Sequence, residues 1–338
     1  MEYTQIFGDA EVREEFLDRF TEIRDAVMSS GGLEGVGALE GMLQVDRAGD
    51  AVKRMAEGTW HGDGDSGLEA IVRKFGRPVY LIRRNTFATA ADAPDDDAES
   101  LVIAARVSAA RRRLEGVIPS VGRVDLRNHD ETWVGTAWMV ADGLAVTNHH
   151  VAKTFATRRG DGFVFRESSG ARVHAYVDWY HEHGRTRESR FRVTEVVWME
   201  PDPSCDAALI RLAPAGEDGE PLPPPIPLAE GDEGVRVGRW VGVIGYPWTG
   251  RHDDPADRTR IFDGIFECKR LAPGRIISFE GDRLIHHDAT TLGGNSGSVV
   301  VDLDTGRALG LHYQGWPKRR NYAVRAASVA RLVHRHAS

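Results

Sequence analysis

The residue pattern changes at Val121, and this change constrains the fold more than any other feature of the sequence. From Val121 onward, short runs rich in β-branched and aromatic residues alternate with Gly, Pro and Asp, which favour turns. Many short strands with regular turn signals are typical of an all-β barrel or sandwich. Strands are expected over residues 122–126, 133–140, 144–147, 172–176, 192–199, 207–212, 240–244, 264–270, 275–279, 298–302, 308–312 and 323–325, with a closing helix over 327–335.

The preceding residues have a helical pattern instead. Between residues 13 and 27, apolar side chains recur at helical spacing, and two glycines follow as a stop signal. Since 338 residues suit about two domains, we predict a mostly helical N-terminal region, residues 1–116, and a β-rich domain, residues 117–338. The elements expected in the first region are helices over 13–27, 33–55, 68–75 and 99–114, a strand over 78–82 and an acidic loop over 90–97.

The charge balance argues against a nucleic-acid partner. The chain has a formal net charge of -8 at pH 7, whereas a general nucleic-acid binder needs a basic face that replaces phosphate counterions. The basic runs at residues 111–113 and 318–320 are interpreted as solvated surface.

Cysteine content and the N-terminal sequence predict the compartment. Only two cysteines occur, Cys205 and Cys268, which allow at most one bridge and no disulfide framework. The first residues lack the basic and apolar regions of a secretory signal. No run approaches the roughly 18 apolar residues of a membrane helix. We therefore predict a cytoplasmic protein with reduced thiols and no membrane association.

Three short motifs carry candidate chemistry. A serine flanked by glycines lies in Gly293–Ser298, a histidine pair lies in Val146–Val151, and Asp206 precedes an apolar run. A serine needs an adjacent base to take its proton during attack, and an imidazole titrates near neutrality. A carboxylate then fixes the tautomer of the imidazole. The predicted roles are nucleophile for Ser296, general base for His150 and orienting carboxylate for Asp206.

The same serine motif supplies candidate donors for an oxyanion. The tetrahedral intermediate of acyl transfer needs preorganised N–H groups at its negative oxygen. The backbone N–H groups of Gly294 and Ser296 can both face inward only in a tight turn, which the glycines permit. Gly294 and Ser296 are therefore the predicted oxyanion hole.

Together these segments resemble the trypsin-like, chymotrypsin-fold serine peptidases, and most of all the bacterial branch with the glutamyl endopeptidases and HtrA-type proteases. The motifs are Gly135–Val140, Thr147–Val151, Asp206–Ile210 and Gly293–Ser298, and the similarity extends over about residues 121–338. The resemblance implies two six-stranded antiparallel barrels with the active site in the cleft between them. It also selects His150 over His149 as the base, which leaves a structural role for His149.

Each motif alone also has an ordinary structural interpretation. The Asn-Ser-Gly segment is compatible with a plain turn, and Asp206 with a strand cap. Three motifs in the order His, Asp, Ser within a β-rich domain favour the catalytic interpretation. The other histidine clusters, 149–150, 181–183 and 286–288, lack the spacing of metal-binding motifs, so we expect no metal and no cofactor. Cys205 is interpreted as a small buried hydrophobic residue.

The residue before the serine departs from trypsin. Trypsin-type zymogens are activated when a new N-terminal amine pairs with an aspartate just before the serine, and Asn295 occupies that position here. This ion pair is therefore excluded. We hypothesise that residues 1–116 govern activity instead, by packing on the barrels or by binding an activating protein partner.

The resemblance also indicates the residues of the substrate pocket, which are Thr290, Thr291, His312, Tyr313 and Gly315. Thr290 occupies the place where a preference for basic residues would need an acidic one, although Asp288 nearby keeps a basic P1 residue open. Thr291 with His312 resembles the pair that holds an acidic side chain in glutamyl endopeptidases. A simple packing role for His312 is equally compatible with the sequence.

The predicted function is that of a bacterial serine endopeptidase that hydrolyses protein or peptide substrates through an acyl-enzyme. The alternative is a silent or latent peptide-binding module that retains the protease fold.

Overall fold

The computed structural model describes residues 53, 54, 57, 79–87, 98–202, 205–248, 265–291, 294–316 and 320–336. Contacts divide the chain into two compact units, Met1–Gly76 and Arg77–Ser338, and the second is described below. The expected helices over 13–27 and 68–75 and the acidic loop over 90–97 lie outside the described residues. Of the expected helix over 33–55, only residues 53 and 54 are described, and both are helical.

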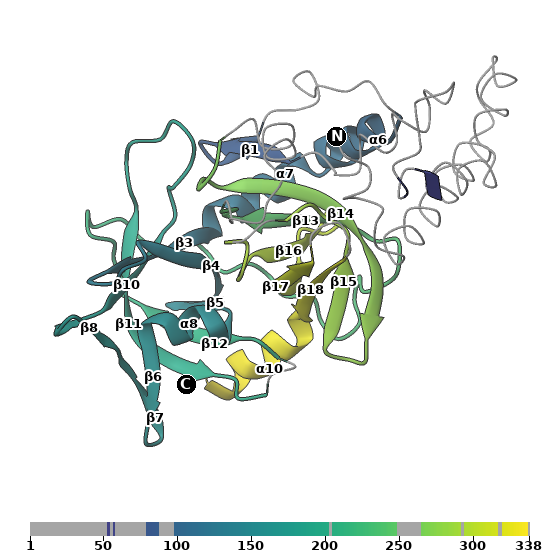
Figure 1. Ribbon diagram of the computed structural model, residues 1–338. Helices are drawn as coiled ribbons and strands as arrows, with labels where there is room; N and C mark the ends of the chain where they lie inside the picture. Colours follow the sequence, from purple (N-terminus) through teal and green to yellow (C-terminus); the bar gives the residue numbers. More distant parts are fainter. Residues whose placement is uncertain are drawn as a thin grey trace, which may run out of the picture. The chain divides into compact units, whose positions relative to one another are not determined.

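Six antiparallel strands close the first barrel (Figure 1), in the order β10-β11-β12-β5-β4-β3. The short helix α8 (His149–Phe155) follows β5, and the hairpins β6–β7 and β8–β9 form separate two-stranded sheets. The strands of this part are β3 (Val121–Arg127), β4 (Trp133–Ala141), β5 (Leu144–Thr147), β6 (Ala156–Arg159), β7 (Gly162–Phe165), β8 (Glu167–Ser168), β9 (Ala171–Arg172), β10 (His174–Asp178), β11 (Arg190–Met199) and β12 (Ala208–Leu212).

The second barrel is also built from six antiparallel strands. They follow the order β13-β16-β17-β18-β15-β14, and pairing of β13 with β14 joins the two ends. Helix α10 (Ala326–His336) follows the last strand. The strands are β13 (Trp240–Gly245), β14 (Arg270–Glu280), β15 (Leu284–His287), β16 (Val299–Asp302), β17 (Ala308–Trp316) and β18 (Arg320–Arg325). The prediction of a mainly β fold with two six-stranded barrels is confirmed.

A segment that precedes the barrels is built into the second one. Strand β1 (Tyr80–Arg83) pairs with β14, and β2 (Thr86–Phe87) pairs with β1. Helices α6 (Ala98–Ala109) and α7 (Arg111–Val117) follow, and the single turn η2 (Ile118–Ser120) leads into β3. The compact unit thus begins at Arg77, upstream of the predicted boundary at residue 116.

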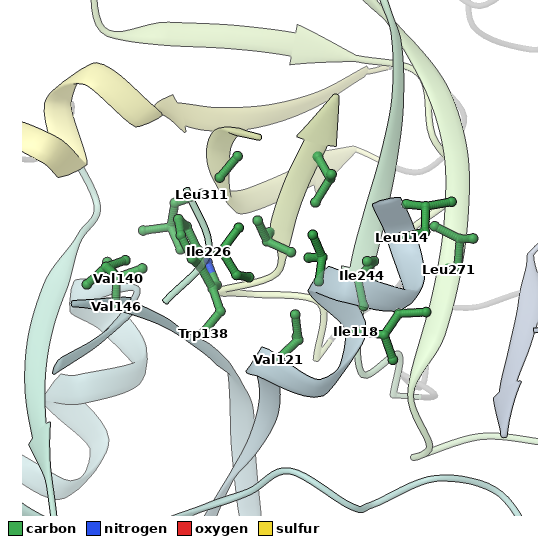
Figure 2. Packing of buried hydrophobic residues seen from close by; sticks show 14 of the residues in the cluster. Leu114, Ile118, Val121, Trp138, Val140, Val146, Ile226, Ile244, Leu271 and Leu311 are labelled. Atoms are coloured by element: carbon green, nitrogen blue, oxygen red, sulfur yellow. The ribbon is translucent and has the colours of Figure 1, made fainter. Parts of the chain in front are cut away.

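One apolar cluster joins this segment to both barrels (Figure 2). Leu114 and Ile118 lie beside Ile244 and Leu271 of the second barrel, and the same cluster contains Trp138 of the first. Separate apolar clusters fill the interior of each barrel. Burial of apolar side chains is the main favourable term in folding, so the two barrels and α7 stabilise one another. No helix in the described ranges has the length and apolar character needed to cross a bilayer.

The expected strands agree well with the observed ones, with one exception. The strand predicted over 264–270 was wrong, since only Arg270 of its described residues belongs to a strand. Glu267 has a φ of 60°, and its N–H donates to the Pro247 carbonyl at 3.1 Å. The chain therefore turns where extended backbone was expected. Strand β14 begins after this turn and continues through the run predicted over 275–279.

Helix α7 offers a test of this shared core. Leu114 is fully buried in the cluster, whereas Val102 on α6 is 47% exposed. We expect Leu114→Ala to lower the free energy of unfolding by about 2 to 5 kcal/mol, because the cavity is enclosed on all sides. Val102→Ala is the control and should change it by less than about 0.5 kcal/mol. Chemical denaturation of both variants measures this, and equal effects would contradict packing of α7 on the barrels.

Candidate active site

Helix α8 carries the histidine pair and begins directly after β5. Asn148 precedes the helix in an extended conformation, so the two histidines occupy its first turn. His149 turns toward β11, where its Nδ1 lies 2.7 Å from the Glu200 carbonyl oxygen. The His150 side chain is 50% exposed and faces Asp206 instead. The structure thus gives the two neighbouring histidines different partners.

Asp206 holds His150 at two points. Its Oδ2 lies 2.5 Å from His150 Nδ1, and its Oδ1 accepts the His150 backbone N–H at 3.1 Å. The Asn148 amide donates to the Asp206 carbonyl at 2.7 Å, which fixes the residue just before β12. A carboxylate that accepts from Nδ1–H favours the tautomer with an unprotonated Nε2. This arrangement suits an imidazole that must take a proton at Nε2.

The serine loop is fixed to strands of both barrels. The Ser296 carbonyl accepts the N–H of Thr136 on β4 at 2.8 Å. The Gly297 N–H donates to the His312 carbonyl at 2.8 Å, and the His312 N–H donates to the Ser298 carbonyl at 2.9 Å. Ser296 itself is half-buried. The loop is therefore held by main-chain bonds on each side of the serine.

Gly135 on β4 lies where the histidine helix and the serine loop meet. A β-carbon at this position would lie 2.8 Å from Val151 Cγ2 and 2.9 Å from the Ser296 carbonyl oxygen. Val151 follows His150, so any side chain at position 135 would push base and nucleophile apart. The absence of a side chain at Gly135 thus lets Val151, next to His150, and the Ser296 main chain approach the same point of β4.

The predicted oxyanion donors lie in this loop. Gly294 has a φ of 80°, in the left-handed region that favours glycine. Its carbonyl accepts from the Thr136 hydroxyl at 3.4 Å. Within the described part of the chain, no hydrogen bond uses the N–H of Gly294 or of Ser296. Asn295 between them is buried, and its Oδ1 accepts from the Ser298 hydroxyl at 3.3 Å.

The residues predicted for the substrate pocket come from three neighbouring segments. Thr290 and Thr291 are half-buried after β15, while His312, Tyr313 and Gly315 lie on β17. The Thr291 hydroxyl donates to Asn321 Oδ1 at 2.5 Å, and the Asn321 amide donates to the Ala289 carbonyl at 2.7 Å. Gly315 pairs with Asn321 across the strands β17 and β18. Asn321 thus joins the two walls, and no sequence motif indicated it.

Tyr313 lies near the candidate triad. Burial raises the pKa of its phenol to about 12, and the charge of Asp206 adds to this shift. Its ring lies 6.1 Å from that of Tyr322 on β18. A protonated phenol in this place offers apolar surface and an O–H donor to a bound chain.

A second buried histidine lies behind His312. His287 Nε2 is 3.2 Å from His312 Nδ1, and both rings are almost completely buried. Burial lowers the pKa of His287 to about 3. Burial, with His287 and His150 nearby, lowers the pKa of His312 well below its usual value. Both imidazoles are therefore neutral. The sequence analysis considered the segment 286–288 only as a metal motif and missed this contact.

Both cysteines are buried thiols with no disulfide between them. Cys205 and Cys268 are free and buried, and burial raises the pKa of the Cys205 thiol to about 11. A neutral thiol is a poor nucleophile. Among the residues that the structure describes, no three His, Cys, Asp or Glu side chains are grouped to hold a metal ion.

The buried histidines predict an acid-sensitive fold. In the unfolded chain a histidine titrates near pH 6.5, so between about pH 6.5 and pH 3 the unfolded state binds protons that the folded state excludes. The free energy of unfolding should therefore be highest above about pH 6.5. Below that pH it should fall as the pH falls, by up to about 1.4 kcal/mol per pH unit for each histidine. Urea denaturation at several pH values measures the slope. His287→Asn should make the slope of stability against pH shallower. An unchanged slope would contradict the conclusion that His287 is buried in its neutral form.

The chain is similar to known peptidases in sequence and to a solved structure. Residues 135–311, a little over half of the chain, match the model of the trypsin-like peptidase domain. A probable serine protease of Lysobacter enzymogenes is 29% identical over 311 residues, which cover 83% of this chain and 78% of the relative. The crystal structure of Rv3671c from M. tuberculosis H37Rv, a serine-to-alanine variant in its inactive form, aligns with a TM-score of 0.41 and 21% identity over 74% of this chain and 96% of that one. On the family match, the chain belongs to the trypsin-like peptidases.

Proposed function

We propose that the chain is a serine endopeptidase in which Ser296, His150 and Asp206 form the catalytic triad. The observation that carries this proposal is the two-point contact of Asp206 with His150, beside a serine loop that approaches the same helix across Gly135. Membership of the trypsin-like peptidase family supports it. Location inside the cell and activation by a partner remain predictions.

The proposed reaction has two steps. His150 Nε2 takes the hydroxyl proton while Ser296 Oγ attacks the peptide carbonyl, and the imidazolium then gives that proton to the leaving amine. Asp206 stabilises the imidazolium. The N–H groups of Gly294 and Ser296 bind the negative oxygen of each tetrahedral intermediate. Water, activated by the same imidazole, then releases the acid product from the acyl-enzyme.

A serine-directed probe tests the nucleophile. We expect a fluorophosphonate to label the wild-type protein and not Ser296→Ala, because only an activated serine reacts readily. Ser278→Ala is a matched control, since Ser278 on the same barrel also contacts a histidine, with Oγ 2.6 Å from His286 Nδ1. It should retain labelling at the wild-type rate.

Labelling that survives in Ser296→Ala would contradict the assignment. A wild-type protein that hydrolyses no peptide and never reacts with the probe would instead favour a peptide-binding module with the protease fold.

We further propose that the enzyme prefers an acidic residue at P1. His312 contacts the serine loop through its main chain, and its Nδ1 faces His287. Its Nε2 is then the ring nitrogen that can donate to a carboxylate. Asp288, the residue that would favour a basic P1 side chain, accepts the Arg275 backbone N–H at 2.6 Å through Oδ1. This bond supports a structural role for Asp288.

Matched peptides that differ only at P1 test this preference. We expect a higher kcat/KM for Glu than for Lys or Ala. Thr291→Val should lower kcat/KM for the Glu peptide by about tenfold or more and affect the Ala peptide less. The Thr291 hydroxyl must turn from Asn321 to donate to the P1 carboxylate, and valine has no proton to donate. A cleavage profile dominated by Lys or Arg would refute an acidic preference.

A further inference from the structure

A buried ion pair outside the triad remains unexplained by the proposed reaction. Lys269 and Glu182 both have fully buried side chains, and Lys269 Nζ lies 3.6 Å from Glu182 Oε1. Removing two charges from water costs several kcal/mol per ion, so a buried pair is weak support for a purely stabilising role. The partners of this pair indicate another role.

Each member of the pair binds segments that are distant in the chain. The Lys269 ammonium donates to the Trp179 carbonyl at 2.8 Å and to the Ile118 carbonyl at 3.1 Å. Glu182 accepts the Asn85 backbone N–H at the turn between β1 and β2, with distances of 3.3 and 3.1 Å to its two oxygens. The pair thus connects the segment upstream of the barrels to the start of β3 and the residues that follow β10.

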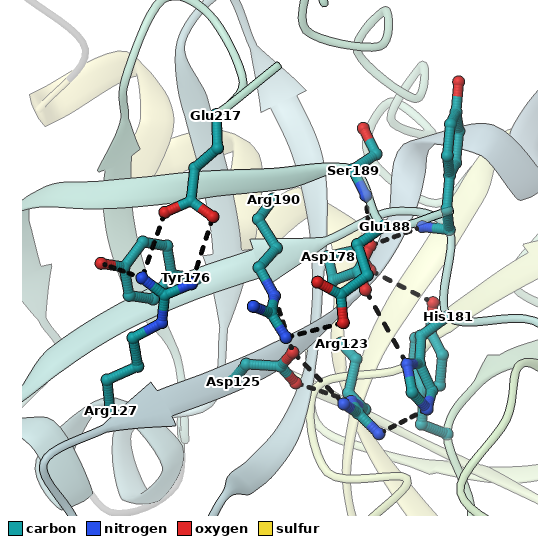
Figure 3. A network of polar contacts seen from close by, with 12 residues as sticks. Arg123, Asp125, Arg127, Tyr176, Asp178, His181, Glu188, Ser189, Arg190 and Glu217 are labelled. Atoms are coloured by element: carbon teal, nitrogen blue, oxygen red, sulfur yellow. Dashed lines mark hydrogen bonds and ion pairs between the residues drawn. The ribbon is translucent and has the colours of Figure 1, made fainter. Parts of the chain in front are cut away.

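The segment that carries Glu182 is itself held firmly (Figure 3). The buried Asp178 accepts the backbone N–H groups of Tyr180 and Ser189, each at 2.9 Å. His181 Nε2 lies 2.7 Å from a guanidinium nitrogen of Arg123 on β3. Glu182 is therefore presented from a closed loop with little freedom, and its carboxylate keeps a defined position.

Tyr246 connects the pair to the serine loop. The Lys269 ammonium lies 6.0 Å from the centre of the Tyr246 ring, which is completely buried. The Tyr246 N–H donates to the Thr136 hydroxyl at 3.3 Å. Its carbonyl oxygen packs against Gly294, where an added β-carbon would approach it to 2.6 Å. A shift of Tyr246 would therefore move the backbone that supplies the oxyanion donors.

We propose that Glu182 and Lys269 are positioning residues that hold the serine loop through Tyr246 and make the β1–β2 turn part of the active-site scaffold. The inference rests on the proposed function for its catalytic consequence. Its structural content, order in residues 294–298, does not depend on catalysis.

Three variants test the proposal, Glu182→Gln, Lys269→Met and the double variant, with Asp302→Asn as a matched control. Asp302 is also buried in the second barrel and ion-paired, with its Oδ2 2.6 Å from Arg239. The measurements are thermal unfolding, kcat and KM on one peptide, and hydrogen exchange of the peptide that contains residues 294–298.

We expect each single variant to lower kcat by about tenfold or more with a small change in KM, because misplaced oxyanion donors act on the transition state. Hydrogen exchange over 294–298 should become faster. The double variant should lose less than the two single losses combined, since it leaves neither Lys269 nor Glu182 as a charge without its buried partner. Arg185, which also pairs with Glu182 at 3.4 Å, is partly exposed and can be solvated. Asp302→Asn should be less stable, with unchanged kcat and exchange in the loop.

Folded single variants with wild-type exchange over 294–298 would overturn the positioning role. The positioning role would also be overturned if Asp302→Asn lost as much kcat as the Glu182 and Lys269 variants for the same loss of thermal stability. If the wild-type protein has no peptidase activity, the proposed function fails, and hydrogen exchange alone still decides whether the pair orders the loop.

Discussion

The hydrogen bonds of Thr136 hold the candidate site together. Its N–H donates to the Ser296 carbonyl, and its carbonyl accepts from the Thr147 hydroxyl at 2.7 Å. Its own hydroxyl accepts the Tyr246 N–H and donates to the Gly294 carbonyl. Thr136 is completely buried, so each bond forms where water does not compete. One residue of β4 thereby fixes the serine loop, the strand before the histidine helix and the end of β13.

This arrangement makes the candidate site depend on both barrels. The proposed nucleophile comes from the second barrel, while the proposed base and its carboxylate come from the first. Their geometry depends on the apolar cluster that both barrels share with α7. A reaction that tolerates little displacement of its groups needs such a rigid support. The packing of the interface is therefore a condition for the chemistry as well as for stability.

The barrels were predictable because turn residues and strand patterns are local. The β6–β7 hairpin was missed although Gly160, with a φ of 62°, and Asp161 mark its turn. The strand over 264–270 was predicted wrongly for a different reason. Its β-branched and aromatic residues resemble a strand, but the backbone at Glu267 is in the left-handed region. Propensity was overridden there by a long-range bond to Pro247.

The candidate triad residues lie in short motifs that the sequence shows, whereas the residues that support them do not. His150, Asp206 and Ser296 lie in recognisable segments, and the structure brings His150 and Asp206 into contact. Asn321 and Lys269 lie in segments with no chemical signature, and His287 lies in a histidine cluster that was considered only as a metal motif. Their positions result from strand pairing between β15, β17 and β18 and from burial at the start of β14. Such contacts join residues far apart in sequence, and a single sequence carries no direct signal of them.

The pairing of β1 with β14 has a consequence for any proteolytic processing of the chain. Cleavage between β2 and α6 would break the covalent link, but the strand pairing and the Asn85 contact with Glu182 would still connect the upstream fragment to the barrel. The products would remain a noncovalent two-fragment complex. A shortened chain that starts at Val117 would lack β1, β2 and Leu114 of the shared core. A loss of activity in such a chain would therefore reflect incomplete folding as well as any loss of regulation.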